Sequence, residues 1–536
     1  MRVDRHSMSD ESLASALAAV PDELGRETKL AENGGPFGIE MLADMLLDYA
    51  AARTVAIDPR VETRETWLAL TSAASLYRDY ARAQTVPAGG EVRAFVDYLG
   101  VGFGFRQERD ESLRAYDWVR AYQVALAVGQ DDVLLGLYSL GESLPEDNDL
   151  QGLRAFWTKQ PAETYPDSPG GRMLRAIAGG DAAAFNGELA AELERHRDRA
   201  GRYPRDLIAW GPLAMARLAY EAGLPIEVES GYLPDRLLTR AGPAKPSADG
   251  PIARPGFDAD RAARWLARAS ERSDRKVESA FSPSVLVEYR FSAMAHPGEF
   301  MTLALSFRSV LDPRAESAAY TDGLVVASES LASAFRLASA PRGTTIAVTL
   351  RGRTEELPAS GPTGDASDWR YARAAALAWT SRRPADAAIL AAVDPDQLRT
   401  TIPDSHAYAR ACHAVLRGQD PRPHLKEALA KTSGDEHWEC LRNPRARLLE
   451  RIVEDDADGF NAVLADSLGL YRDYHSAGDR IDDPDGQLFF DALGLACLAH
   501  DQGIPVRVES EYLPRAVIEG RFRGAGTGWQ HPRPTT

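Results

Sequence analysis

The chain has 536 residues, of which 44% are hydrophobic and 26% are charged. A single hydrophobic core seldom keeps growing to this size, so we expect two or more folded domains and little disorder. The formal charge is −17, and both halves are acidic, because residues 1–245 hold 27 basic and 38 acidic residues and the remainder hold 35 and 41. Phosphate binding needs clustered Lys and Arg, so direct nucleic-acid binding is disfavoured. The charge either steers the chain toward a basic partner or only keeps it in solution.

The three cysteines, Cys412, Cys440 and Cys497, form no CxxC pair. Their absence from the first 245 residues excludes a disulfide framework there and suits a reducing compartment. The opening residues lead into a charged helical pattern, which is not that of a secretory signal. No uninterrupted apolar stretch approaches about 18 residues, so no membrane span is expected. These features predict a soluble, cytoplasmic protein.

In chain order, the first half is dominated by Ala, Leu, Arg and Glu, which favours helices. Residues 91–99 alternate between apolar and polar side chains, although less regularly than residues 344–357 of the second half. They are the candidate for a small β-hairpin in the first half. Residues 241–257 are rich in Gly and Pro and lack hydrophobic periodicity, so we interpret them as a linker.

The second half opens with a helical run from Asp258. Apolar residues then alternate through 344–357 around Arg351-Gly352, which predicts a β-hairpin. Apolar spacing predicts helices at 461–476 and 488–501.

The end of the 488–501 helix is marked by Gly503, which we expect in the left-handed position that follows many helices. Pro505 cannot continue the helix, and Val506 and Val508 suggest a brief extended segment. Pro514 can open a last short helix.

An internal repeat links the two halves. Residues 218–238 and 498–518 align without gaps, and ten of the 21 positions are identical. Composition alone would give roughly one or two identities. The shared pattern is Gly-x-Pro-x-x-Val-Glu-Ser-x-Tyr-Leu-Pro, and its two occurrences indicate a duplication.

Weaker matches extend the duplication along the chain. Residues 58–62 match 312–316 at an offset of 254, Asp117-Trp118 match Asp368-Trp369 at an offset of 251, and Phe185-Asn186 match Phe460-Asn461 at an offset of 275. The increase of the offset from 251 to 275 places about 24 additional residues in the second copy, between Trp369 and Phe460.

The predicted fold is therefore mainly α, with two tandem helical domains related by internal duplication, each with a small β-hairpin. The expected domains are a diverged, shortened first copy at 1–240, a Pro/Gly linker at 241–257, a second copy at 258–522 and a disordered tail at 523–536.

The repeated block supplies the candidate partner-binding residues, which are Glu229, Ser230, Tyr232, Glu509, Ser510 and Tyr512. A structural interpretation is favoured for most of the block, because Gly stops a helix, Ser caps the next turn and a buried Tyr ring packs. Glu229 and Glu509 are the members that packing explains least.

Catalytic and metal-binding motifs are not recognisable. His406, His413, His424 and His437 lie near Cys412 and Cys440, but without HxxxH or CxxC spacing, so zinc is disfavoured. The chain contains no Gly-x-Ser-x-Gly, phosphate-cradling glycine loop or HExxH motif. We expect no catalytic residues, metal or cofactor, although a helical fold can assemble an active site from dispersed residues.

The segment FNAVLADSLGLYRDYHSAGDRIDDPDGQLFFDALGLACLAHDQGIPVRVESEYLP, from Phe460 to Pro514, resembles the immunity 49 family of bacterial polymorphic-toxin immunity proteins. Residues 1–6, residues 357–362 and the helix at Asp368-Trp369 support the resemblance. It covers both copies and is strongest over 300–520 and 185–240. The first copy departs from it, because it lacks about 24 residues before Phe185 and its hairpin region at 101–105 is irregular.

The resemblance implies a mainly helical, non-enzymatic antitoxin that binds and neutralises a cognate toxin in the cytoplasm. Many such toxins are nucleases with basic active faces, which an acidic surface can block. One alternative is a helical-repeat adaptor or regulator for another cytoplasmic partner, and another is an enzyme acting on a small molecule. A toxin gene beside this one would favour the antitoxin over the adaptor.

Overall fold

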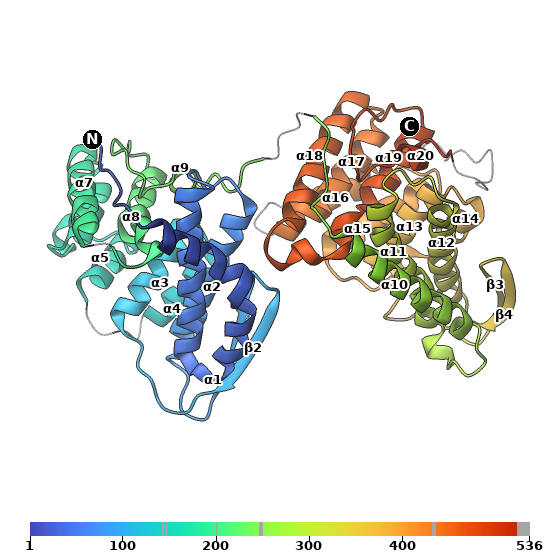
Figure 1. The fold of residues 1–536 in the computed structure, drawn as a ribbon, viewed down its shortest axis with the longest axis horizontal. Coiled ribbons are helices and arrows are strands. Elements are labelled where there is room, and N and C mark those ends of the chain that lie inside the picture. Colours follow the sequence, from blue (N-terminus) through green and yellow to red (C-terminus); the bar gives the residue numbers. More distant parts are fainter. Residues whose placement is uncertain (142–143, 145–146, 200, 246–249, 431–435, 522–536) are drawn as a thin grey trace. The chain divides into compact units, whose positions relative to one another are not determined.

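The computed structural model describes residues 1–141, 144, 147–199, 201–245, 250–430 and 436–521 (Figure 1). The chain forms two compact units, of which unit 1 comprises residues 1–244 and 477–479, and unit 2 comprises residues 245–476 and those from 480 onward. Each unit has its own hydrophobic core. The described residues are mainly helical with one two-stranded antiparallel sheet in each unit, which confirms the predicted fold class. The predicted tail at 523–536 lies outside the described residues.

The helices and strands of unit 1 are α1 (Asp10–Ala56), α2 (Arg64–Ala83), β1 (Glu91–Val96), β2 (Val101–Arg106), α3 (Ala115–Val128), α4 (Asp131–Gly141), α5 (Asn148–Trp157), α6 (Pro169–Gly179), α7 (Ala182–Arg199), α8 (Trp210–Glu221) and α9 (Asp235–Leu238). Those of unit 2 are α10 (Ala259–Ala280), α11 (Arg290–Leu311), α12 (Ala318–Ser339), β3 (Thr345–Leu350), β4 (Arg353–Pro358), α13 (Asp368–Ser381), α14 (Pro384–Ala391), α15 (Pro403–Leu416), α16 (Arg422–Leu429), α17 (Asn443–Val453), α18 (Ala457–His475), α19 (Phe490–Asp501) and α20 (Arg515–Ile518). Within this described part, no helix combines the length and apolar composition that a membrane crossing requires.

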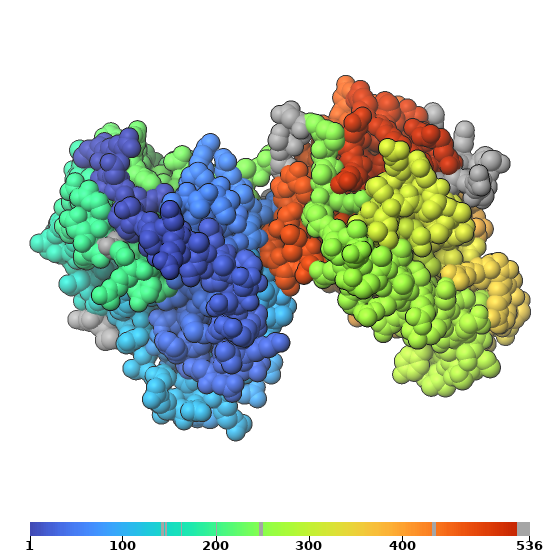
Figure 2. Space-filling model, in the orientation of Figure 1, coloured from blue at the N-terminus to red at the C-terminus, as the bar shows by residue number. Residues whose placement is uncertain are grey.

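The first helices of the two units correspond, although their continuity differs. Helix α1 contains a kink at Gly35, whose φ of 59° is left-handed and interrupts the helical backbone. In unit 2 the equivalent stretch is divided into α10 and α11, which pack closely together. Helix α10 begins at the predicted place, where the Asp258 side chain accepts a hydrogen bond from the Arg261 amide. It buries small residues along one face only and lies at the surface of its unit (Figure 2).

Each unit contains one β-hairpin, and the two compare differently with the sequence predictions. Strands β3 and β4 pair from Thr345–Pro358 to Leu350–Arg353, and the two-residue turn has φ of 53° at Arg351 and 71° at Gly352. Both values are left-handed, as a primed hairpin turn requires, and the prediction for 344–357 is confirmed. In unit 1 the hairpin extends beyond the predicted 91–99, because the irregular 101–105 segment forms β2.

One part of the sequence alignment is wrong. Helices α3 and α13 are both 14 residues long, and their first residues differ by 253 positions instead of 251. The Trp118 indole donates a hydrogen bond to the Leu137 carbonyl, and the Tyr371 hydroxyl donates to the Leu390 carbonyl, each 19 residues later. Tyr371 is therefore the counterpart of Trp118, and Trp369 is 44% exposed. The two tryptophans of the identical Asp-Trp pairs therefore differ in their surroundings, since Trp118 is buried and Trp369 is exposed.

The additional residues of the second copy include one more helix. Helices α4, α5 and α6 lie between α3 and α7, whereas α14, α15, α16 and α17 lie between α13 and α18. Helix α16 packs against both α15 and α17. Residues of the predicted linker also belong to unit 2, since Ile252 is 3% exposed and pairs with the 509–511 segment.

Candidate functional site

Glycine ends the helix that precedes each repeated block. Helix α8 ends at Glu221 and α19 at Asp501, and two residues later Gly223 and Gly503 have φ of 81° and 91°. A residue without Cβ takes this left-handed conformation at low cost. The predicted helix stop at Gly503 is confirmed, and both blocks leave their helices in the same way.

One asparagine in each unit holds the chain that follows the glycine. Asn186 on α7 donates to the Pro225 carbonyl at 2.9 Å and accepts from the Glu227 amide at 2.8 Å. Asn461 on α18 donates to the Pro505 carbonyl at 2.8 Å and accepts from the Arg507 amide at 2.7 Å. Residues 504–508 form no strand, and the Asn461 side-chain amide holds this segment in place.

Replacing Asn461 with leucine should lower the free energy of unfolding by about 2 kcal/mol, because the Arg507 amide and the Pro505 carbonyl lose their partner. Chemical denaturation measures the change. The matched change Asn186→Leu in unit 1 should give a similar loss, and a loss below about 0.5 kcal/mol in both would contradict the clamp.

The serine and tyrosine of each block are engaged inside their own unit. The hydroxyls of Ser230 and Ser510 accept hydrogen bonds from the amides of Tyr232 and Tyr512 at 3.3 and 3.2 Å. Both tyrosine side chains are fully buried, and burial raises the pKa of each phenol. Tyr512 donates to the Gly486 carbonyl at 3.1 Å. These contacts orient the block and leave the tyrosine rings away from solvent.

The glutamates of the two blocks are exposed at the surface of their respective units. Their backbone is fixed, because the Val3 amide donates to the Glu229 carbonyl at 3.0 Å and the Ile252 amide donates to the Glu509 carbonyl at 2.9 Å. The structure thus brings Glu, Ser and Tyr together within each block. It leaves each glutamate exposed, on a backbone that is held by a hydrogen bond from the Val3 or the Ile252 amide.

A partly buried arginine beneath each block was not predicted. Arg5 donates to the Thr54 hydroxyl at 2.8 Å and the Leu207 carbonyl at 3.3 Å. Arg254 donates to the Ser309 hydroxyl at 2.7 Å and to the carbonyl of Gln487, which lies 280 positions after Leu207. Burial lowers the pKa of both guanidinium groups. The signal in the sequence is an apolar-x-Arg pair, Val3-x-Arg5 and Ile252-x-Arg254, which is too short to find without the structure.

A second guanidinium occupies the same place in both units but comes from different elements. Arg217 on α8 donates to the Ala127 carbonyl at 2.9 Å, and its nitrogens lie about 3 Å from where a Cβ on Gly129 would stand. In unit 2 the residue that follows α13, and so corresponds to Gly129, is Arg382. Arg382 donates to the Val517 carbonyl at 2.7 Å. The residue that corresponds to Arg217 is Cys497. A guanidinium donor is thus present at this place in both units, although the arginine that supplies it stands at a different position of the repeat in each.

The His and Cys residues of 406–440 are dispersed. Cys412 and Cys440 are buried, and burial raises the pKa of the Cys412 thiol to about 12, so it stays protonated at neutral pH. The His413 ring bonds to the Ala391 carbonyl at 3.2 Å. Across the described ranges, no group of three or more His, Cys, Asp or Glu side chains is arranged to hold a metal ion.

The sequence model of the immunity protein 49 family matches residues 106–237 and 312–517. No curated protein and no solved structure matches the chain. The two matched regions include both repeated blocks and the helices that precede them. Together they cover more than half of the chain, which therefore belongs to the immunity protein 49 family.

Proposed function

We propose that this protein is a non-enzymatic antitoxin, which acts in the cytoplasm by binding a cognate protein toxin and covering its active surface. The observation that supports the proposal most is the presence of two family regions, each ending in a rigid block with an exposed glutamate. The net charge of −17 favours a basic toxin, such as a nuclease, because opposite charges accelerate encounter and favour docking.

The decisive experiment is co-expression of this chain with the toxin whose gene lies beside its own. We expect growth to be restored and the two proteins to copurify as a stoichiometric complex. Growth arrest despite good expression of this chain would contradict the proposal, as would turnover of a substrate by the purified chain that a single side-chain change abolishes.

The block glutamates give a test of the contact surface. Changing Glu229 and Glu509 to lysine should weaken binding of a basic toxin about tenfold for each contact that the toxin makes, or about 1.4 kcal/mol. Because both carboxylates are exposed, the melting temperature should change little. Titration calorimetry measures the affinity, and a fall in melting temperature with unchanged affinity would show that the glutamates are structural.

A further inference from the structure

Helix α10 lies at the surface of unit 2 (Figure 2) and carries a row of cations. Arg264, Arg268, Arg272 and Lys276 stand four residues apart, so they share one face of the helix and recur about every 6 Å along it. The three arginines are exposed and Lys276 is half-buried. We call these four residues the α10 basic stripe. Like charges at this spacing destabilise a helix, so the stripe does not serve the stability of α10 itself.

Aromatic rings support two of the guanidinium groups. Arg268 lies over the Trp265 ring, 5.3 Å from its centroid, and Arg272 lies over the Phe300 ring of α11 at 4.7 Å. The Trp265 ring is 43% exposed and stacks on Phe307, with 6.3 Å between the centroids. A guanidinium that lies over a ring keeps N–H groups at its edge, where they can reach a carboxylate. The two cations are thus held in place with their hydrogen-bond donors available.

The acidic side chains around the stripe do not neutralise it. Those of α10 are Asp260, Glu271, Asp274 and Glu278. Asp274 and Glu278 pair with arginines of the hairpin at 2.6 and 3.2 Å, and Glu271 pairs one turn further along the helix at 3.5 Å. On α11, Glu299 pairs with an arginine of α13 at 2.8 Å. Within the described ranges, no residue of the basic stripe forms an ion pair or a hydrogen bond, so its charge remains available to a partner.

Unit 1 has the opposite charge at the corresponding positions. Ser9 caps α1 as Asp258 caps α10, 249 positions later, so α10 corresponds to residues 10–31. This stretch of α1 holds five acidic and two basic residues, whereas α10 holds four acidic and six basic ones. The residues that correspond to the basic stripe are Ser15, Ala19, Glu23 and Glu27. The stripe is therefore a property of the second copy alone.

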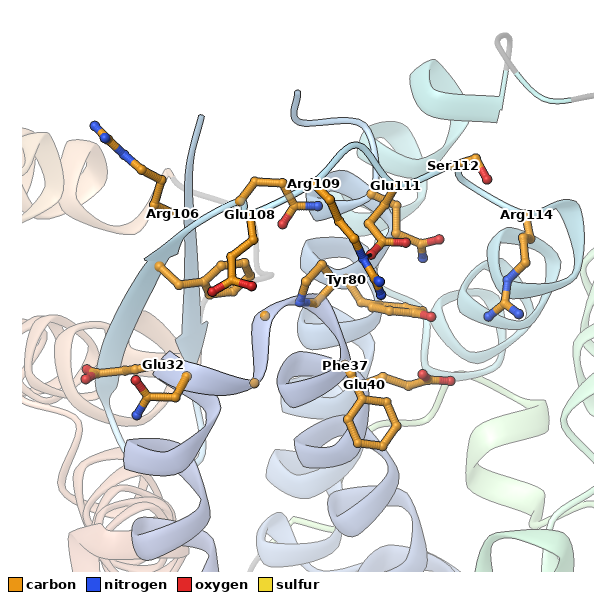
Figure 3. Close-up of a pocket in the computed structure, with 17 residues that line it drawn as sticks. Glu32, Phe37, Glu40, Tyr80, Arg106, Glu108, Arg109, Glu111, Ser112 and Arg114 are labelled. Carbon is orange, nitrogen blue, oxygen red and sulfur yellow. Dashed lines mark hydrogen bonds and ion pairs between the residues drawn. The ribbon is translucent and has the colours of Figure 1, made fainter. Parts of the chain in front are cut away.

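A pocket of unit 1 shows no comparable excess of one charge. It has a volume of about 810 Å³ and lies between residues 32–40, the end of α2 and residues 105–114 (Figure 3). Four glutamates and three arginines line it, and Arg109 donates to Glu111 at 2.8 Å. These charges largely balance one another, so the pocket selects neither an anion nor a cation. The basic stripe, in contrast, selects an anion.

We propose that the α10 basic stripe binds an acidic helix of a partner protein. Acidic residues at every fourth position of a helix also recur about every 6 Å, so a helix lying along α10 can pair one carboxylate with each cation. The exposed Trp265 ring beside the stripe offers an apolar contact to the same helix. The inference goes beyond the proposed function, because the stripe takes an acidic element whereas Glu229 and Glu509 would meet a basic one.

Nucleic acid is the other polyanion that a row of arginines can bind, and the charge of the chain disfavours it. Both halves of the chain are acidic, and Asp260 and Glu271 are exposed beside the stripe. A nucleic-acid backbone carries a charge on every nucleotide and would meet these carboxylates as well. Carboxylates four residues apart on a helix align with the stripe alone.

The first test measures binding of a defined acidic helix to the full chain. The probe is a fluorescently labelled, capped peptide of four Ala-Glu-Ala-Ala repeats, and its control has glutamine in place of glutamate. Fluorescence anisotropy at low ionic strength should show the glutamate peptide binding at least about tenfold more tightly, and high salt should remove the difference. Equal binding of the two peptides would overturn the inference.

The second test gives unit 2 the residues of unit 1. Arg272→Glu combined with Lys276→Glu reproduces Glu23 and Glu27, which pair with Arg26 at 3.4 and 2.9 Å. Unit 2 also has an arginine at the place of Arg26, so the double variant should keep the melting temperature of the wild type. It should bind the glutamate peptide at least about tenfold more weakly. Binding with the wild-type affinity would overturn the inference.

A matched pair of single variants separates the stripe from the general charge of the chain. Arg268→Glu should weaken binding of the glutamate peptide about threefold or more. Arg447→Glu is the control, because Arg447 is exposed on α17 and makes no ion pair in the described part of unit 2. The control should bind as the wild type does, and equal losses in both variants would overturn the inference.

Two further measurements test other occupants. A short labelled single-stranded oligonucleotide should bind more weakly than the glutamate peptide, and tighter binding that the double variant loses would overturn the inference in favour of nucleic acid. Sedimentation velocity should show no self-association that depends on the stripe, since such association would make a second copy the occupant. None of these measurements uses the toxin, so the proposed function and this inference can fail independently.

Discussion

Replacing Arg217 with cysteine should lower the free energy of unfolding of unit 1 by about 3 kcal/mol. The side chain is 1% exposed, donates to the Ala127 carbonyl at the end of α3, and pairs with Glu221 at 3.2 Å. Cysteine leaves the carbonyl without a donor and a cavity where the guanidinium stood. Hydrogen exchange of the α3 and α8 amides measures the loss in unit 1 alone.

The arrangement of unit 2 supplies the control for this prediction. Gly129→Arg combined with Arg217→Cys reproduces the pair Arg382 and Cys497, so the double variant should recover most of the stability. Gly129→Arg alone should destabilise, because the new side chain and Arg217 then compete for one site and repel each other. Gly129 already has a left-handed φ of 80°, as Arg382 has a left-handed φ of 49°, so the backbone needs no rearrangement. Additive effects of the two changes would contradict the shared site.

Acidification should destabilise unit 2 through His475. This side chain is 3% exposed, and burial, followed by the charge of Arg480, lowers its pKa to about 3. An unfolded histidine has a pKa of about 6.5, so below that pH the unfolded chain binds a proton that the folded chain does not. The stabilisation is complete above pH 6.5 and falls as the pH is lowered toward 3. The loss from this group reaches about 3 kcal/mol near pH 4.

Two replacements separate the titration from the packing. His475→Phe keeps a ring against Tyr471, whose centroid lies 4.5 Å from that of the histidine, and His475→Gln keeps a neutral polar group. Their stabilities at pH 8 should differ, yet both should show the same flatter decline between pH 7 and 4 in denaturant titrations. A pH dependence equal to that of the wild type in both variants would show that His475 does not contribute.

Local sequence patterns determined much of the fold. The alternation before Arg351-Gly352 requires a hairpin with a left-handed turn, and Gly503 ends α19, because these preferences act between neighbouring residues. The repeated block revealed the duplication through ten identities in 21 positions. Within the block of unit 2, Ser510 and Tyr512 make hydrogen bonds inside the unit, whereas Glu509 is exposed.

Only the tertiary structure decided which residues meet across long distances in the chain. Asp117-Trp118 and Asp368-Trp369 look equivalent in sequence. The hydrogen bond that Trp118 makes to a leucine carbonyl 19 residues later is made in unit 2 by Tyr371, which is therefore its counterpart. The same guanidinium site is filled from α8 in unit 1 and from the end of α13 in unit 2, so no alignment column preserves it.

The pocket of unit 1 likewise joins residues from 32 to 114 around a single left-handed glycine. Helix and turn preferences are local and can be read from neighbouring residues. A buried donor only has to reach its acceptor in space, and more than one position in the chain can supply it.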